Sequence, residues 1–311
     1  MEEKCLFSFG AIADVQYADA PDGWDFHKTA LRRYRNSLVC LKEAVDCWES
    51  GPPIQFVVQL GDLLDGLCRR DPHPIVNMLL KQFKNYDVHN LVGNHELYNF
   101  RREEINSILN VNRPVHDSKR AYYEFSPYEG WRFVALDSYD LCTIQEDTKQ
   151  EALRYLKQYN PNDVDNYGVD WTKGLEGASL KYLPYNGGLS QKQLDWLTEV
   201  LARATQNKEK VILLTHIPLA PDSAAPQNIL WNSEEALRIV YSFRCVVACL
   251  AGHDHKGGYT LDDHGIHHLT FFAPLEVPQD QNAFGTIHVY PNKLLLAGNG
   301  LIPSRTLPFR E

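Results

Sequence analysis

Residues 54–65 read IQFVVQLGDLLD, and this stretch decides the fold class. Its first seven positions are mostly apolar, with β-branched and aromatic side chains, which predicts a strand buried on both faces. Such strands are typical of parallel sheets that helices cover on each side. Gly61 and Asp62 follow at once, and open α/β sheets bind ligands at the carboxyl ends of their strands. The stretch therefore predicts an α/β fold with a candidate site residue, Asp62, at the end of a buried strand.

On both sides of this stretch, short apolar runs alternate with segments of helical periodicity. The apolar runs predict strands at residues 6–13, 54–60, 88–92, 122–125, 131–136, 211–215, 246–251, 258–261, 266–272, 286–290 and 294–297. Helical spacing of apolar side chains predicts helices at residues 26–49, 75–83, 101–109, 151–158 and 234–243. Ser190 and Gln193 have the spacing of a capping box, which predicts the start of one more helix. The β-α-β order of the first half favours parallel strands with helices on both faces.

Residues 138–188 interrupt this alternation. Apart from the helix expected at 151–158, the segment is rich in Asn, Asp, Gly and Tyr. A long irregular stretch inside a compact domain is usually functional or disordered, and the aromatic side chains here favour an ordered loop. Two interpretations stay open, a lid over the substrate and a simple structural insertion. With no repeat or linker elsewhere, we expect residues 1–311 to form a single domain.

Charge and composition exclude several classes of protein. The chain has 311 residues, of which 44% are hydrophobic and 23% charged, as in a globular protein; 31 basic against 40 acidic residues give a net charge of −9. Such a protein repels a polyphosphate chain unless a patch or a metal reverses the local field. A nucleic-acid partner is therefore disfavoured, whereas a small phosphorylated metabolite is not. We expect a monomer.

The sequence also predicts the compartment. No stretch approaches the ~18 apolar residues of a membrane span, and the N-terminus lacks the features of a signal peptide. The seven cysteines have no spacing typical of a disulfide framework. We expect a cytoplasmic protein without a membrane partner.

Oxygen and nitrogen donors follow five of the expected strands. They are Asp14, Gln16, Asp62, Asn94, His216, His253 and His255. Because the carboxyl ends of these strands meet at one edge of the fold, we expect the donors to point at one spot. Mixed carboxylate, amide and imidazole donors without thiolate suit Mn²⁺, Fe or Zn²⁺ rather than Ca²⁺. The sequence therefore predicts a pair of divalent cations, which Asp62 can bridge because a carboxylate has two oxygens.

In this order the motifs resemble those of the calcineurin-like metallophosphoesterases, whose pattern is D-x-H, G-D-x-x-D, G-N-H-E/D, a single H and G-H-x-H. The resemblance covers about residues 5–297 and implies a four-layer α/β/β/α sandwich of two mixed β-sheets. It implies one cation held by Asp14, Gln16, Asp62 and His255. It implies a second cation held by Asp62, Asn94, His216 and His253. His95 would be the catalytic acid near the leaving group.

One position departs from this pattern. Gln16 stands where the family usually has His, and an amide oxygen is a weaker, harder donor than imidazole, which favours activity dependent on added Mn²⁺. Mg²⁺, Zn²⁺ or Fe could also occupy the site. Gln here, with GDLLD and GHDH, is similar to a manganese-dependent branch of the family that hydrolyses nucleoside diphosphate compounds. The implied substrates are ADP-ribose, CDP-choline, CDP-ethanolamine and CDP-glycerol, split at the pyrophosphate to a nucleoside monophosphate and a phosphate ester.

The implied mechanism is in-line attack by a hydroxide that bridges two cations about 3.5–4 Å apart. His95 would protonate the departing phosphate oxygen. A cyclic-nucleotide or general phosphodiesterase is an alternative, and a non-catalytic scaffold on the same fold is another that the full set of donors disfavours. Relatives with Tyr after G-D-x-x or Arg after G-D-x-x-D are set aside, because Asp65 and Gly66 stand at those positions.

Two aromatic residues are candidates for contacting the substrate. Phe26 follows the first motif and Tyr98 follows the third, so both could border the pocket and stack on a base or ribose. Core packing is an equally good interpretation of both.

Overall fold

The computed structural model describes residues 4–25, 28–111 and 119–310, and its two large sheets are both mixed. The decisive stretch forms β4 (Phe56–Gln59), which lies between β1 (Phe7–Ile12) and β5 (Val88–Asn90) and is parallel to both. On its other side β1 pairs antiparallel with β12, and the sheet continues through β13 and β14. These last three strands are Ala283–Val289, Lys293–Gly300 and Arg305–Pro308.

The second sheet has the strand order β10-β11-β9-β8-β7-β6. Its four inner strands run parallel to one another, and the strands at its two edges are antiparallel to their neighbours. In chain order the six strands are Tyr123–Tyr128, Trp131–Ala135, Lys210–Leu214, Val246–Ala251, Lys256–Leu261 and His267–Phe272. The hairpin expected across residues 126–130 is therefore confirmed as β6 and β7.

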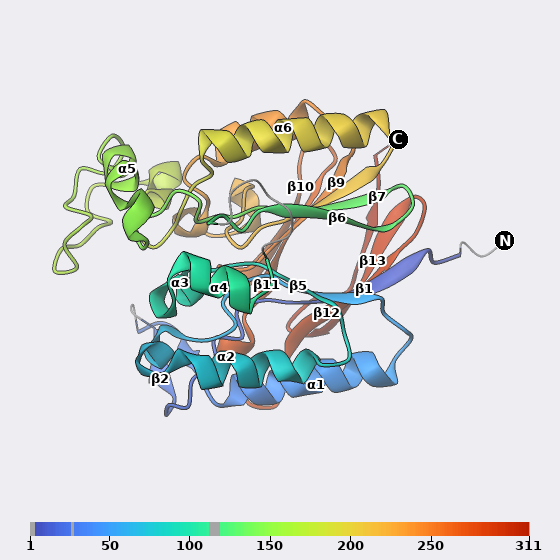
Figure 1. Ribbon diagram of the computed structural model, residues 1–311, viewed down its shortest axis with the longest axis horizontal. Coiled ribbons are helices and arrows are strands. Elements are labelled where there is room, and N and C mark those ends of the chain that lie inside the picture. The colour runs from blue at the N-terminus through green and yellow to red at the C-terminus, as the bar shows by residue number, and fades with distance from the viewer. Residues whose placement is uncertain (1–3, 26–27, 112–118, 311) are drawn as a thin grey trace.

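Helices cover the outer face of each sheet and complete four layers (Figure 1). On the first sheet lie α1 (Asn36–Ser50), which contacts β12, and α2 (Pro72–Leu80). On the second lie α6 (Gln191–Gln206), which contacts β8, and α7 (Ser233–Tyr241), which packs on α6. The expected α/β/β/α sandwich of two mixed sheets is confirmed. None of the helices in the described part of the chain combines the length and apolar character needed to cross a membrane.

Aromatic side chains join the inner faces of the two sheets. Phe9 and Phe56 of the first sheet meet Phe133 of the second at ring-centroid distances of 5.1 and 5.3 Å, both edge to face. Phe56 also meets Phe125 at 5.5 Å. Edge-to-face pairs contribute about 0.5–1.5 kcal/mol beyond their buried area. These contacts help to fix the two sheets against each other, and hence the relative positions of their strand ends.

Several of the remaining elements lie beyond the carboxyl ends of the parallel strands (Figure 1). Three helices, α3, α4 and α5, lie at this end of the molecule, away from both termini (Figure 1). They are Asn94–Asn99, Arg102–Ile108 and Glu146–Leu156. A two-stranded ribbon consists of β2 (Gly23–Trp24) and β3 (Leu31–Arg32). Short 3₁₀ turns occupy Gly66–Arg70, Lys81–Phe83, Gly177–Lys181, Pro221–Ser223, Pro226–Asn228 and Pro274–Glu276.

The helix expected from residue 26 begins ten residues later. Before it, residues 23–24 and 31–32 form the β2–β3 ribbon instead. Asp25 stabilises its turn, because its carboxylate accepts the backbone N–H groups of Thr29 and Ala30 at 2.6 and 3.1 Å. Local side-chain bonds of this kind compete with the helix, so periodicity alone placed the start wrongly.

The expected capping box at α6 is half formed. Ser190 accepts the backbone N–H of Gln193 at 3.2 Å, as predicted. The Gln193 side chain does not return to Ser190; it bonds the backbone of Asp137 on both sides. The Ser190 N–H donates to the carboxylate of Asp140 at 3.2 Å instead. A charged acceptor gives a stronger hydrogen bond than a neutral amide, which explains the exchange.

The irregular segment has a small core of its own. Helix α5 begins at Glu146, five residues before the helix expected there, and Glu146 and Asp147 supply the acidic first turn that helices favour. A second hydrophobic cluster forms around Trp231, whose indole N–H donates to the carbonyl of Leu183 at 3.0 Å. Its other members are Leu141, Ala152, Leu153, Leu156 and Val164. The segment thus packs against the loop before α7.

Candidate metal centre

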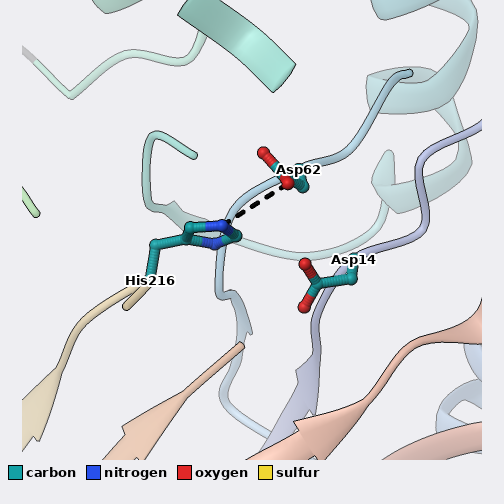
Figure 2. A group of neighbouring side chains, drawn as sticks. All are labelled: Asp14, Asp62 and His216. Atoms are coloured by element: carbon teal, nitrogen blue, oxygen red, sulfur yellow. Dashed lines mark ion pairs between the residues drawn. The ribbon is translucent and has the colours of Figure 1, made fainter. Parts of the chain in front are cut away.

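Three side chains from three strand ends meet in the interior. Asp14 follows β1, Asp62 follows β4 and His216 follows β8, and Figure 2 shows them pointing toward one another. One possible ligand atom from each lies within 4.8 Å of the others, and all three residues are buried. Two acidic groups and an imidazole in a buried space this small are suited to a divalent cation. The parallel strands therefore deliver their end groups to one point, as the sequence predicts.

Several of the candidate ligands have a left-handed backbone. The φ angles are +50° at Asp14, +42° at Gln16, +57° at Asp62 and +69° at His253. This region costs a non-glycine residue roughly 1–3 kcal/mol and persists where the surrounding structure enforces it. Such residues cluster at functional sites. At each of these positions the left-handed backbone conformation directs the side chain toward the cluster.

Glycine allows two of the loops to approach the ligands. A Cβ at Gly93 would lie 2.0 Å from Asp62 Oδ1, and one at Gly61 would lie 2.3 Å from His216 Nδ1. Gly61 also has φ +103°, a conformation that L side chains rarely adopt. Both positions need glycine so that the carboxylate and the imidazole can occupy their places.

In its neutral form, each of the three imidazoles presents one unprotonated nitrogen. His216 Nδ1 lies 2.8 Å from the carbonyl of Leu60, and His255 Nδ1 lies 2.6 Å from Glu276 Oε1. Both oxygens only accept, so both Nδ1 atoms carry the proton and Nε2 keeps its lone pair. His253 has the reverse arrangement, in which Nε2 lies 2.7 Å from the amide oxygen of Asn186, leaving Nδ1 unprotonated. An outer acceptor that fixes the tautomer in this way is the usual arrangement of a metal-binding histidine.

Two of these lone pairs face carboxylate oxygens. His216 Nε2 lies 3.4 Å from Asp62 Oδ2, and His255 Nε2 lies 3.7 Å from Asp14 Oδ1. Among the described residues, His216 Nε2 and Asp14 Oδ1 are buried and have no hydrogen-bond partner. Two ligands that share an ion lie roughly 3–3.5 Å apart, given bonds of about 2.0–2.2 Å. Electron-rich atoms at this spacing call for a cation between them, so the residues present fit a metal site.

The pKa shifts of the three clustered side chains also indicate that the site favours a positive charge. Burial raises the pKa of Asp14 to about 6 despite the opposing pull of His216 and His255. At Asp62 burial also acts upward, but His216 and His95 hold its pKa well below the usual range. Burial would lower the pKa of His216, yet the charges of Asp62 and Asp14 raise it to about 9. The buried carboxylates therefore favour a positive charge among them, either on the His216 ring or on a metal ion.

Gln16 lies between the two carboxylate–imidazole pairs. Its Nε2 is 3.1 Å from Asp62 Oδ2 and 2.8 Å from His255 Nε2. Its Oε1 is buried and has no hydrogen-bond partner in the described part of the chain. A half-turn of the amide exchanges the two atoms and brings the oxygen between Asp62 and His255. The amide can therefore serve as an oxygen ligand on the side of the cluster that contains His255.

Asn94 and His253 lie on the other side of the cluster. Asn94 begins α3, and its Oδ1 accepts the hydroxyl of Tyr139 at 2.9 Å. The rings of His216 and His253 are 5.1 Å apart. The Asp62 carboxylate lies between the two sides, because its Oδ2 contacts both Gln16 and His216.

His95 is placed beside this cluster. Its backbone N–H donates to Asp62 Oδ1 at 2.8 Å, and its Nδ1 accepts the N–H of Gly66 at 2.9 Å, which leaves the proton of the neutral ring on Nε2. Asp65 Oδ2 lies 3.2 Å from the same Nδ1 and can pair with the protonated ring. Burial acts to lower the pKa of His95, but Asp62 and Asp65 more than offset it and raise the pKa above its ordinary value. A raised pKa favours the protonated imidazole, which is the form that donates a proton.

Glu96 is a residue whose role sequence reasoning missed. Its carboxylate accepts the backbone N–H groups of Asp62 and Gly93 at 2.8 Å each and that of Leu63 at 2.7 Å. It is fully buried, and burial raises its pKa to about 7, with a further contribution from the charge of Asp62. The only sequence signal was its place in the Gly-Asn-His-Glu motif. Glu96 fixes the loop that carries Asp62 to the loop that carries Asn94.

Of the two aromatic residues expected to contact the substrate, the structure describes only Tyr98. Tyr98 lies next to His95, with ring centroids 5.2 Å apart at 69°. Burial raises its pKa to a value above the range in which proteins work, so it stays a neutral hydroxyl. Phe26 lies outside the described residues, so its expected contact stays a prediction.

Comparison with known proteins finds one matching family and relatives that share one name. A family model described as calcineurin-like phosphoesterase matches residues 7–257. A protein of Oryza sativa subsp. japonica named manganese-dependent ADP-ribose/CDP-alcohol diphosphatase is 43% identical over 94% of this chain and 91% of its own length. The protein of the same name from Homo sapiens is 38% identical over 98% of this chain and 94% of its own.

Solved structures show the same likeness. The crystal structure of a dimetal phosphatase from Danio rerio superposes with a TM-score of 0.91 and 35% identity, covering 99% of this chain and 100% of that one. A purple acid phosphatase from yellow lupin shares the fold, with a TM-score of 0.54 and 15% identity over 97% of this chain and 52% of that one.

Proposed function

Because this chain belongs to the calcineurin-like phosphoesterase family, we propose that it is a manganese-dependent hydrolase of nucleoside diphosphate compounds. Its substrates are ADP-ribose and the CDP-alcohols CDP-choline, CDP-ethanolamine and CDP-glycerol. It splits their pyrophosphate to a nucleoside monophosphate and a phosphate ester. Support comes from relatives of that name, 37–43% identical over nearly the whole chain, in plants and vertebrates.

The observation that carries this proposal is the set of three imidazoles with fixed tautomers. Each has its proton on the nitrogen that faces an outer acceptor, so the other nitrogen can bind a metal. A non-catalytic scaffold would not need three histidines with fixed tautomers beside two buried carboxylates. Oxygen and nitrogen donors without thiolate are compatible with Mn²⁺.

The ligands would divide into two sets that share Asp62. One cation would be held by Asp14, Gln16, Asp62 and His255. The other would be held by Asp62, Asn94, His216 and His253. When bound, the two cations would supply an activated water and neutralise charge that develops on the phosphate oxygens. Asp62 would keep both sets in register through the bonds that Glu96 makes to its loop.

His95 would move a proton to the leaving group. With Nδ1 held by Gly66 or Asp65, its Nε2 is the atom available for donation. General-acid help is typically worth ~10²–10⁴-fold in rate. A phosphate ester is a fairly good leaving group, so the contribution of His95 lies toward the lower end for pyrophosphates and rises for alkyl diesters.

The experiment is hydrolysis by purified protein from which metals have been stripped with a chelator. ADP-ribose, CDP-choline, cyclic AMP and p-nitrophenyl phosphate are each assayed with Mn²⁺, with Mg²⁺ and without metal. The proposal expects Mn²⁺-dependent release of AMP or CMP and little nitrophenol. Faster hydrolysis of cyclic AMP would contradict the proposal and favour a phosphodiesterase. Faster hydrolysis of p-nitrophenyl phosphate would contradict it and favour a phosphatase. Absence of any bound metal would favour the scaffold.

We further propose a cytoplasmic monomer whose 311 residues act as one domain, with small nucleotides rather than nucleic acid as partners. The seven cysteines are all free, which suits a reducing compartment, and the net charge of −9 disfavours nucleic acid. Buried residues of both sheets belong to one hydrophobic cluster. Light scattering of the purified protein, with one cooperative unfolding transition, tests the monomer and the single domain.

A further inference from the structure

Two side chains of the irregular segment contact candidate metal ligands. Asn186 lies 2.7 Å from His253 through its amide oxygen, and Tyr139 lies 2.9 Å from Asn94 through its hydroxyl. Both residues are fully buried. They are 47 positions apart, at the two ends of residues 138–188. Each end of the segment therefore holds one ligand.

The amide of Asn186 can take only one orientation. Its Nδ2 donates to the carbonyls of Lys181 and Gln227 at 2.9 and 2.8 Å, so both of its N–H groups are used. The oxygen must then face His253, where it can only accept. His253 Nε2 consequently keeps its proton, and its Nδ1 is the nitrogen available to a metal.

Tyr139 has a matching constraint. Its hydroxyl has a single proton and lies closer to Asn94 Oδ1 than to the carbonyl of Tyr185, at 2.9 against 3.3 Å. Both neighbouring atoms are oxygens that accept, so the hydroxyl is the donor. It orients the amide of Asn94, whose Oδ1 retains a second lone pair for a metal.

The other ligands receive their outer contacts elsewhere. His255 is held by Glu276, and His216 is held by the carbonyl of Leu60. Asp14 accepts the backbone N–H of His253. Among the described contacts of the ligand side chains, the segment thus reaches Asn94 and His253 by hydrogen bonds and His216 by a ring contact of Tyr139 at 6.0 Å. All three belong to the same ligand set.

We propose that residues 138–188 are the outer support of one metal position, with Asn186 and Tyr139 as positioning residues for His253 and Asn94. This inference rests on the proposed function, since it takes over the division of the ligands into two sets. Loss of such an outer contact typically weakens metal binding by ~10–100-fold. Removing Asn186 should therefore weaken one of the two positions and spare the other.

The test measures bound Mn²⁺ by dialysis at a free concentration that just fills both positions of the wild type. The wild type should retain two ions per chain, and Asn186→Ala should retain one. Asn186→Asp keeps an oxygen that accepts from His253, so it should restore the second ion even where it lowers stability. Asn160 is the matched control, because it is also buried in the segment and bonds the carbonyls of Trp171 and Tyr182 without touching a ligand. Asn160→Ala should retain two ions.

Double variants identify the position that is affected. Glu276→Ala removes the outer contact of His255 and should weaken the other position. Asn186→Ala with Tyr139→Phe acts on one position and should leave one ion. Asn186→Ala with Glu276→Ala acts on both and should leave none. One ion in this last variant would overturn the assignment of the segment to a single position.

A measurement on the metal-free protein needs no bound ion. Nitrogen-15 NMR of the wild type should show His253 with its proton on Nε2, and Asn186→Ala should show both tautomers. An unchanged tautomer, or two ions retained by Asn186→Ala, would overturn this inference alone. A wild type that binds fewer than two ions would overturn the proposed function with it.

Discussion

The strand-end loops and the irregular segment both hold candidate ligands, but with different kinds of contact. In the strand-end loops one carboxyl group, that of Glu96, accepts hydrogen bonds from three backbone N–H groups in the loops of Asp62 and Gly93. In the segment, single neutral side chains reach across 67 and 45 positions of sequence to His253 and Asn94. The first arrangement fixes the course of the backbone, and the second fixes only the orientation of a side chain.

This difference separates stability from metal affinity. The three backbone N–H groups that donate to Glu96 are buried, and a buried group left unpaired costs about 1–3 kcal/mol. Damage to the strand-end loops should therefore appear as lost stability of the whole fold. Damage to the segment should appear mainly as weaker metal binding. Three substitutions test this comparison, in order of decreasing effect.

Glu96→Gln should destabilise the metal-free protein by about 2–3 kcal/mol. The new amide group must face at least one of the backbone N–H groups that the carboxylate accepts, so a buried donor loses its partner. Urea unfolding measures the change. Glu199→Gln, on the exposed side of α6, is the control and should be neutral. A loss below about 0.5 kcal/mol would show that the loops do not depend on this carboxylate.

Gln16→His should lower the Mn²⁺ concentration needed for half-maximal activity by about tenfold, which corresponds to ~1.4 kcal/mol. Imidazole is a stronger donor than an amide oxygen, and His tolerates the left-handed backbone at this position well. A metal titration of the rate of AMP release checks this. An unchanged or higher requirement would mean that Gln16 does not face a metal.

Tyr139→Phe should weaken Mn²⁺ binding by only a few-fold, because one neutral hydrogen bond contributes about 0.5–1.5 kcal/mol. The ring stays in place, so the unfolding midpoint should change little. Binding is measured by titration of the metal-free protein. Tyr167→Phe, in the same segment at a residue that is 86% exposed, should have no effect. Equal effects of the two substitutions would contradict the role of Tyr139.

The sequence predicts the meeting of the strand-end side chains for a physical reason. Asp14, Asp62 and His216 follow buried strands directly, so strand direction alone places them at one edge. The alternation of elements predicts the parallel strands but places helices on both faces of a sheet, which is wrong. Helices cover only the outer face of each sheet (Figure 1), and the inner faces pack on each other, as the family resemblance implies. The ribbon before α1 was missed because Asp25 bonds locally, against the helical period.

The outer contacts could not be predicted in the same way. Glu96 stands in a motif, but its partners are backbone groups that only folding brings near. Asn186 lies in the sequence Tyr-Asn-Gly-Gly, which reads as a turn and gives no sign of an imidazole partner. Glu276 is 21 positions from His255 in an unremarkable run. Contacts between side chains distant in sequence leave no local pattern.

The left-handed backbone at the candidate ligands limits which amino acids these positions accept. Asp14, Asp62 and His253 adopt a conformation in which Asp, Asn and His are enriched and β-branched residues are genuine outliers. The backbone therefore restricts these positions to a few residue types before any ion binds, and those types are themselves oxygen or nitrogen donors. A library randomised there and selected only for folding should already be enriched in metal ligands. Gln16 lies outside that group, so such a selection should replace it most readily.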